Sequence, residues 1–485
     1  MVSKSKVKKP REATLWEALI PVVSTIALLM YCVLPYFKVE QPVHIPLVLG
    51  SLIAAIVAIT RLGYCWQDIE DGIISSISGT MQAIIILAII GMIIGTWILG
   101  GIVPTLIFYG LKILSPGIFL VASCLLCCVV SLATGSSWTT AGTVGIALMG
   151  VAAGLGIPAP MAAGAIISGA YFGDKMSPLS DTTNLAPAMA GAKLFDHISH
   201  MVYTTGASLG IALIGFGILG FKFAGTALDS SKIDAINNLM SQKFTITPFL
   251  LLVPIIVIIM VAKKVPAIPG LFIGVLLGGV AAMLTQGANF SDVMSAMQDG
   301  VVSETGNKLL DTLLTRGGYQ SMMFTISLIL AALSFGGILE KTGMLESLAK
   351  RVLKYAKSTG SLVTATVFTA IFTNILAGDQ YLSLVLPGKM YKDEYRKRGL
   401  APRNLSRCLE DAGTITSPLV PWNTCGVFMS GALQVPTLEY LPYCFLNLVN
   451  PLVSIFFGFT GITMMKLEDD PSAPEYKGVK EQASM

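Results

Sequence analysis

Tyr171–Pro187 has the sequence YFGDKMSPLSDTTNLAP and directly follows the apolar run GIPAPMAAGAIISGA of residues 156–170. The apolar run is suited to lipid, yet Asp174, Lys175 and Asp181 come after it beside helix-breaking prolines. Irregular backbone at membrane depth survives only where protein or a water-filled cavity surrounds it. The stretch therefore predicts a helix that is broken inside a membrane, with charges that require partners or a function.

The composition of the chain also places it in a membrane. Hydrophobic residues make up 54% of its 485 residues and charged residues 12%, with a mean hydropathy of +0.74. Soluble domains carry about 25% charged residues. Windows such as Ile45–Ile59 and Met81–Gly100 contain no charged residue, and a spanning helix needs roughly 20 mostly apolar residues. We therefore expect an all-α polytopic membrane protein in contact with membrane lipid.

Other classes of function lack support in the sequence. It has no HExxH motif, no nucleotide-binding loop and no recognisable pair of nucleophile and base, so we predict neither an enzyme nor a cofactor. The net charge is +4, but Lys and Arg cluster at membrane borders as topology requires, so no nucleic-acid partner is predicted. Cys124, Cys127 and Cys128 lack the second half of a zinc site, so no metal site is expected among them.

Three short matches in the same order indicate that the chain contains two copies of one unit. Residues 70–73 resemble 298–301, residues 100–102 match 336–338, and residues 177–179 match 417–419. The predicted organisation is a cytoplasmic N-terminal tail (1–14), a first membrane repeat (15–223), a linker (224–243), a second membrane repeat (244–466) and a cytoplasmic C-terminal tail (467–485).

Each repeat is predicted to contain a re-entrant hairpin followed by a broken helix. The hairpins lie at about 117–155 and 360–390, and the broken helices at about 158–190 and 402–435. A hairpin that does not cross leaves five crossings in each repeat, and this odd number inverts the second repeat relative to the first. With both termini in the cytoplasm, most dense clusters of Lys and Arg fall on the cytoplasmic side, as the positive-inside rule requires.

The hairpin tips and helix breaks form the predicted binding site. Paired interruptions in corresponding positions of two inverted repeats are the best sequence pointer to a transporter site, and half-helix ends there can bind ions. Sodium and a proton both bind carboxylates. Desolvation that raises the pKa of a carboxylate lets it bind either ion near neutral pH. The candidate carboxylates are Asp174, Asp181, Asp379, Glu410 and Asp411.

Structural roles are the alternatives at these positions. Asp174 could pair with Lys175, or with another lysine, and hold two helices together. Asp181 could cap the half-helix that follows it, as Asp often does. Glu410 and Asp411 follow a basic segment, so one of them could be a surface charge.

Four motifs together resemble the NhaC-type Na+/H+ antiporters, a family of the ion-transporter superfamily that includes malate/lactate antiporters. The motifs are TGSSWTTAGTVG, GAYFGDKMSPLSDTTNLAP, ILAGDQYLSLVLPG and EDAGTITSPLVPWNTCG, and the resemblance covers nearly the whole chain. Superfamily members carry two inverted repeats, each with a re-entrant hairpin and a broken helix. By analogy, the implied sodium ligands are Ser136, Ser137, Thr139, Ser177, Thr182, Asn184, Asn374, Ser417, Asn423 and Thr424.

The resemblance implies two alternative transport reactions. The first exchanges Na+, with Li+ as a further candidate ion, for H+ across a bacterial plasma membrane by alternating access. The second exchanges malate for lactate, coupled to H+ and Na+. Lys175 is the cation placed inside a break, where it could neutralise a substrate carboxylate or balance Asp174. One cation among several acids favours simple ion exchange. The hairpins and the broken helices would form a mobile unit, and the remaining helices would form a scaffold. A homodimer is a candidate assembly.

Overall fold

The computed structural model describes residues 10–33, 43–224, 230–263, 265–307, 310–311, 314–354 and 356–470. Residues 1–9 and 471–485 of the predicted tails, and residues 225–229 of the predicted linker, lie outside the described residues.

Every regular element in these ranges is a helix, and two isolated β-bridges join extended residues. Eight of the described helices are long and apolar enough to cross a membrane, and ten spans result if each of two bent helix pairs counts as one. The prediction of an all-α multi-pass membrane protein is confirmed, whereas the inversion of the two repeats stays a prediction.

The N-terminal half of the chain contains α1 (Leu15–Val33), α2 (His44–Val57), α3 (Trp66–Leu99), α4 (Ile102–Ile113), α5 (Pro116–Thr134), α6 (Ser137–Thr140), α7 (Ile146–Gly154), α8 (Ala159–Met176), α9 (Asp181–Ala190), α10 (Leu194–Ala224) and α11 (Ser230–Lys243). The C-terminal half contains α12 (Leu252–Ala262), α13 (Ala267–Thr285), α14 (Phe290–Asp299), α16 (Met323–Lys341), α17 (Met344–Leu353), α18 (Thr359–Ala377), α19 (Gln380–Lys397), α20 (Pro402–Leu409), α21 (Thr424–Leu433), α22 (Thr437–Tyr440) and α23 (Phe445–Thr460).

Helices α5 and α8 pack against each other at backbone distance. A Cβ atom added to Gly169 would lie 2.1 Å from the carbonyl oxygen of Cys124, and one added to Gly173 would lie 2.4 Å from the amide nitrogen of Leu132. Small residues spaced four apart allow membrane helices to approach this closely. The close packing fixes the end of α8, and therefore the break that follows it, against α5.

The turns that follow α5 and α18 have the same structure. Helix α5 is followed by Gly135 and α18 by Gly378, with φ of +69° and +66°, a left-handed conformation that favours glycine. The next residue, Ser136 or Asp379, caps the following helix, because its side chain accepts a hydrogen bond from the backbone N–H three residues later. Both turns lie inside the segments predicted as hairpins.

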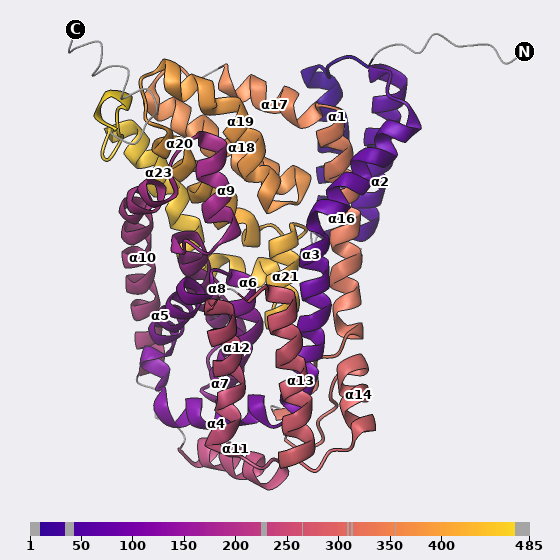
Figure 1. Ribbon diagram of the computed structural model, residues 1–485, viewed down its shortest axis with the longest axis vertical. Coiled ribbons are helices and arrows are strands. Elements are labelled where there is room, and N and C mark those ends of the chain that lie inside the picture. The colour runs from indigo at the N-terminus through magenta and orange to yellow at the C-terminus, as the bar shows by residue number, and fades with distance from the viewer. Residues whose placement is uncertain are drawn as a thin grey trace, which may run out of the picture.

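The two predicted broken helices are interrupted in the structure as well. Helix α8 ends at Met176, and α9 begins at Asp181. Helix α20 runs into a π-helical turn over Glu410–Thr414 and a 3-10 turn over Ser417–Leu419, before α21 begins at Thr424. Single π-helical turns occur frequently at functional sites. Figure 1 places α6, α8 and α21 together near mid-height of the molecule.

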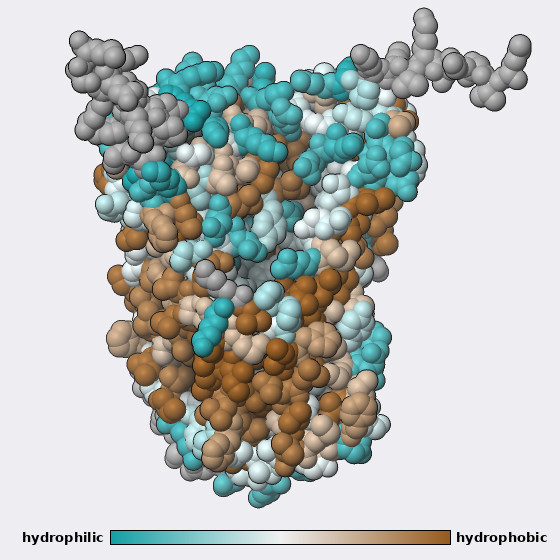
Figure 2. Space-filling view, viewed as in Figure 1, coloured by the Kyte–Doolittle hydropathy of each residue, from teal (hydrophilic) through white to brown (hydrophobic). Residues whose placement is uncertain are grey.

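The surface carries apolar side chains as a membrane protein requires. Large apolar residues such as Phe221 on α10 and Leu284 on α13 are exposed, at 76% and 80%. Figure 2 shows a wide brown region over the lower part of the face in view, and hydrophilic residues at the upper end and around a hollow at mid-height. An apolar belt of this kind is the surface that contacts lipid.

We predict that Gly173→Ala separates α8 from α5 and destabilises the protein. Overpacking of this kind costs typically about 1–3 kcal/mol, so the melting temperature in detergent should fall. Gly210→Ala on α10 is the matched control, because a Cβ there meets nothing within 4 Å. Equal melting temperatures of the two variants would contradict the close packing.

Candidate functional site

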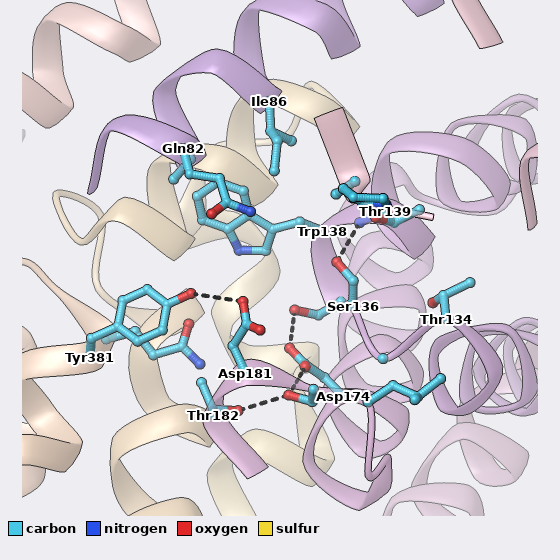
Figure 3. Close-up of a pocket in the computed structure, with 18 of the residues that line it drawn as sticks. Gln82, Ile86, Thr134, Ser136, Trp138, Thr139, Asp174, Asp181, Thr182 and Tyr381 are labelled. Atoms are coloured by element: carbon cyan, nitrogen blue, oxygen red, sulfur yellow. Dashed lines mark hydrogen bonds between the residues drawn. The ribbon is translucent and has the colours of Figure 1, made fainter. Parts of the chain in front are cut away.

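A cavity of about 670 Å³ lies where the turn at Gly135 and Ser136, the break between α8 and α9, and residues of the C-terminal half of the chain meet. Its polar lining includes Thr134, Ser136, Ser137, Thr139, Asp174, Ser180, Asp181, Thr182, Thr80, Gln82, Gln380, Tyr381 and Thr424. These residues come from α3, the turn between α5 and α6, the break between α8 and α9, α19 and α21. Figure 3 shows the side chains converging from opposite walls.

Asp174 is the best-positioned carboxylate of this cavity. It lies on the last turns of α8 and is 7% exposed. Ser137 donates a hydrogen bond to its Oδ2 atom at 2.6 Å, and Ser180 donates to its Oδ1 atom at 2.6 Å (Figure 3). Hydrogen bonds from both sides stabilise the charged form of a carboxylate. The first turn and the first break therefore meet at Asp174.

Asp181 faces the same cavity without capping its helix. The residue that precedes α9, Ser180, makes no side-chain capping bond, and Asp181 itself is exposed. Its Oδ2 atom lies 3.5 Å from the hydroxyl of Tyr381 on α19, and the close-up shows the two groups pointing toward each other (Figure 3). The capping alternative is wrong, and Asp181 adds a second negative charge to the wall.

Lys175 points away from the cavity and pairs with Asp411. Both side chains are fully buried. Asp411 also accepts hydrogen bonds from Thr204 at 2.9 Å and Asn450 at 2.8 Å. The lysine is therefore paired with Asp411 and not with Asp174, and it does not line the cavity. Among the described residues that line the cavity, none is Lys or Arg.

Glu410 and Asp411 are both buried, so the prediction that one could be a surface charge is wrong. Each is 0% exposed. They begin the π-helical turn, which is packed against α18, α19, α20 and α23. Arg407, one turn earlier, lies with its Nε atom 3.8 Å from Oδ2 of Asp411. Neither carboxylate oxygen of Glu410 has a hydrogen-bond partner within the described structure.

Comparisons with known proteins show which family the chain belongs to. The model of the Na+/H+ antiporter family matches residues 169–462. The chain is 43% identical over 431 residues to the Na(+)/H(+) antiporter NhaC of Alkalihalophilus pseudofirmus, covering 88% of this chain and 92% of that relative.

Two further relatives differ in what they exchange. A malate-2H(+)/Na(+)-lactate antiporter of Bacillus subtilis is 38% identical over 455 residues, covering 94% of this chain and 96% of the relative. The arginine/ornithine antiporter ArcD of Halobacterium salinarum is 38% identical over 461 residues, covering 95% and 94%.

The chain belongs to the Na+/H+ antiporter family. Its named relatives are antiporters and not enzymes, which confirms the prediction that this family member is not an enzyme.

Asp379 has a capping role in this family member. Its Oδ1 atom accepts a hydrogen bond from the backbone N–H of Leu382 at 2.9 Å, at the start of α19, and its Oδ2 atom lies 3.4 Å from the hydroxyl of Thr80. It is 4% exposed and does not line the cavity, although its neighbours Gln380 and Tyr381 do. A role in ion binding for Asp379 stays a prediction.

Half of the implied sodium ligands line the cavity. Ser136, Ser137, Thr139, Thr182 and Thr424 do so. The other five do not line the cavity, and each donates a hydrogen bond within the protein. Ser177 donates to Leu132, Asn184 to Pro178 and Ser180, Asn374 to Gly413 and Thr416, Ser417 to Thr414, and Asn423 to Asn374. Their bonding within the protein favours a structural role.

The sequence analysis did not single out several residues of the site. Ser180, Gln380 and Tyr381 lie within the quoted motifs, so their position at a break or a tip was a usable signal. Thr80 on α3 belongs to an otherwise unremarkable helix, and only the tertiary fold brings it to the cavity. Trp138 stacks on Phe428 of α21 with ring centroids 4.1 Å apart, which joins the two halves of the chain beside the cavity.

We predict that Ser137→Ala and Ser180→Ala each raise the half-saturating concentration of the transported ion about ten-fold or more. A hydrogen bond to a charged group contributes about 1.5–3 kcal/mol, and each variant removes one of the two that orient Asp174. Ser334→Ala on α16 is the control, because this hydroxyl donates only to the carbonyl of Leu330 in its own helix. Transport rates measured against ion concentration check the prediction, and unchanged half-saturation would contradict it.

We also predict that Asp411→Asn destabilises the protein strongly. Removing one partner of a buried ion pair typically costs about 3–5 kcal/mol, because the other charge is left uncompensated. Asp181→Asn should leave the melting temperature nearly unchanged, because Asp181 is exposed. Thermal unfolding in detergent compares the two variants, and similar melting temperatures would show that the Lys175–Asp411 pair does not hold the fold.

Proposed function

We propose that this family member is a secondary active transporter that exchanges Na+ for H+ across a bacterial plasma membrane by alternating access. The observation that carries the proposal is the Asp174 carboxylate, held by two hydroxyls at the wall of a cavity formed by a helix break. Interrupted membrane helices around a central site are typical of alternating access. Relatives named as Na(+)/H(+) antiporters support the same reaction.

Asp174 is the proposed sodium-binding carboxylate. Ser137, Ser180 and Thr182 supply hydroxyl oxygens beside it, and α5 and α8 both end beside the cavity. Oxygen ligands and the negative ends of half-helices are the groups that coordinate Na+ in transporters with broken helices. Li+ could use the same ligands. The remaining implied ligands and Asp379 are proposed to support the site by holding the backbone.

The chemistry of the wall favours a cation over a dicarboxylate. Malate carries two negative charges, whereas the described lining contains Asp174 and Asp181 and lacks Lys and Arg. Lys175, the residue proposed for that role in the malate/lactate alternative, is occupied by Asp411. The alternative therefore has a relative in its favour and the electrostatics of the cavity against it.

An organic cation is the second candidate substrate. The cavity of about 670 Å³ is much larger than a single ion, its charged lining is acidic, and one relative is named an arginine/ornithine antiporter. The indole of Trp138 lies in the wall and offers an aromatic face to a cation. A homodimer and a lipid-facing scaffold are retained as proposals for the assembly.

We predict that Na+ alone drives protons in the purified protein. The protein is reconstituted into sealed liposomes with a pH-sensitive dye inside, and Na+, Li+, malate with lactate, or arginine with ornithine is added in separate arms. Proton movement with Na+ supports the proposal. Proton movement only with malate and lactate, or only with arginine and ornithine, would show that those compounds, and not Na+, drive the exchange.

Asp174→Asn should abolish the Na+-driven proton movement, because it removes the charge that holds the ion. Asp299→Asn is the control, since Asp299 is an exposed acid at the end of α14. Both variants should be purified in equal amounts with similar melting temperatures. Full activity of Asp174→Asn would remove Asp174 from the mechanism.

A further inference from the structure

We propose that Glu410 binds the exchanged proton at a buried site separate from Asp174. This inference rests on the proposed Na+/H+ exchange and assigns its two ions to two different carboxylates. Glu410 lies on the π-helical turn of the second broken helix, whereas Asp174 lies on the first broken helix. Glu410 does not line the cavity.

The surroundings of Glu410 suit a proton better than a metal ion. The side chain is 0% exposed, and no hydrogen bond of normal geometry reaches either carboxylate oxygen, although the hydroxyls of Thr182 and Thr414 lie close to it. Burial of an ionised carboxylate without partners is strongly unfavourable, so such a group takes up a proton instead.

A chain of hydroxyl groups leads from the cavity toward Glu410. Ser180 donates to Asp174 at 2.6 Å, and the hydroxyls of Ser180 and Thr182 lie 3.1 Å apart (Figure 3). Thr182 lines the cavity and also faces Glu410. Hydroxyl groups both donate and accept hydrogen bonds, so Thr182 is placed to pass a proton between the cavity and the buried carboxylate.

The charges around Glu410 make its protonation state matter to the cavity. The charged groups that face it or its turn are Lys175 and Asp174 from α8, Arg407 from α20 and the neighbouring Asp411. The buried tyrosines of α19, Tyr391 and Tyr395, bond to Thr369 and Thr366; Asp181 of α9 is exposed, and α18 and α23 carry no titratable residue.

Protonation of Glu410 therefore changes the charge of the buried group formed by Lys175, Arg407, Asp411 and Glu410. The group is neutral when Glu410 is ionised and has a charge of +1 when Glu410 is protonated. Because Glu410 also lies within electrostatic reach of Asp174, the loss of its negative charge makes the surroundings of the sodium-binding carboxylate more positive and disfavours Na+ there. A proton at Glu410 and Na+ at Asp174 thus exclude each other without sharing a carboxylate, which is the coupling that exchange requires.

The test is Glu410→Gln in the full-length protein, because glutamine imitates the protonated side chain. We expect Na+-driven proton movement to fall by at least about ten-fold. Exchange of radioactive Na+ for Na+ should continue, with half-saturation shifted to about ten-fold higher Na+ and no longer dependent on pH. Glu439→Gln, at an exposed acid before α23, is the control and should behave as the native protein.

The outcomes separate this inference from the proposed function. If Glu410→Gln retains the full native rate of Na+-driven proton movement, this inference is overturned and the proposed function stands. Loss of Na+–Na+ exchange together with proton movement at all Na+ concentrations, in a variant with a native melting temperature, also overturns it, because one shared site would then carry both ions. If Na+ drives no protons in the native protein, the proposed function fails. In that case infrared spectra still test the site. A protonated carboxyl band that is present in the native protein and absent from Glu410→Gln supports the site, and identical spectra of the two proteins exclude it.

The hydroxyl chain has a test of its own. Thr182→Val removes the hydroxyl group but keeps the shape of the side chain, and Thr182→Ser restores the hydroxyl group. We expect slower proton movement at saturating Na+ in the valine variant and recovery in the serine variant. Equal rates in all three proteins would exclude Thr182 from the proton path.

Discussion

A helix that stops inside a bilayer leaves backbone donors and acceptors without water to bond, and the centre of this molecule is organised around that constraint. Asn184 donates to the carbonyls of Pro178 and Ser180 in the first break, and Asn374 donates to the carbonyl of Gly413 in the second. Polar side chains at broken helices therefore divide into two groups. One group bonds the interrupted backbone, and the remainder is available to an ion.

The buried ion pair has a consequence for the cavity beyond its effect on stability. Because Asp411 takes the charge of Lys175, Asp174 is left with hydroxyl partners and without a cation. A carboxylate bonded only to hydroxyls keeps its negative charge available to a mobile ion, whereas one paired with lysine does not. Because Lys175 is paired with Asp411, the charged lining of the cavity is acidic, and Asp181 adds a second negative charge to it.

The sequence was sufficient to predict the helical membrane fold and the places where helices break, because Pro178 and its polar neighbours interrupt a strongly apolar run. One alternative, the pairing of Asp174 with Lys175, could also have been excluded from the sequence. Consecutive helical residues do not face each other, so Asp174 and Lys175 were poor candidates for a pair. The partner of Lys175 lies 236 residues later, and Thr80 reaches the cavity from α3, outside the predicted hairpins and broken helices. Such contacts depend on the tertiary packing of distant helices, which local patterns do not determine.

Two carboxylates in contrasting surroundings also change how exchange can be coupled. A shared carboxylate excludes one ion by the simple presence of the other, and this was the coupling that the residue pattern alone suggested. In the fold, Asp174 is bonded by hydroxyls beside an open cavity, whereas Glu410 is fully buried and has no hydrogen bond of normal geometry among the described residues. Those surroundings favour Na+ at the first and a proton at the second. Since Glu410 lies within electrostatic reach of both Asp174 and Lys175, the ion bound at each carboxylate influences the other through electrostatics.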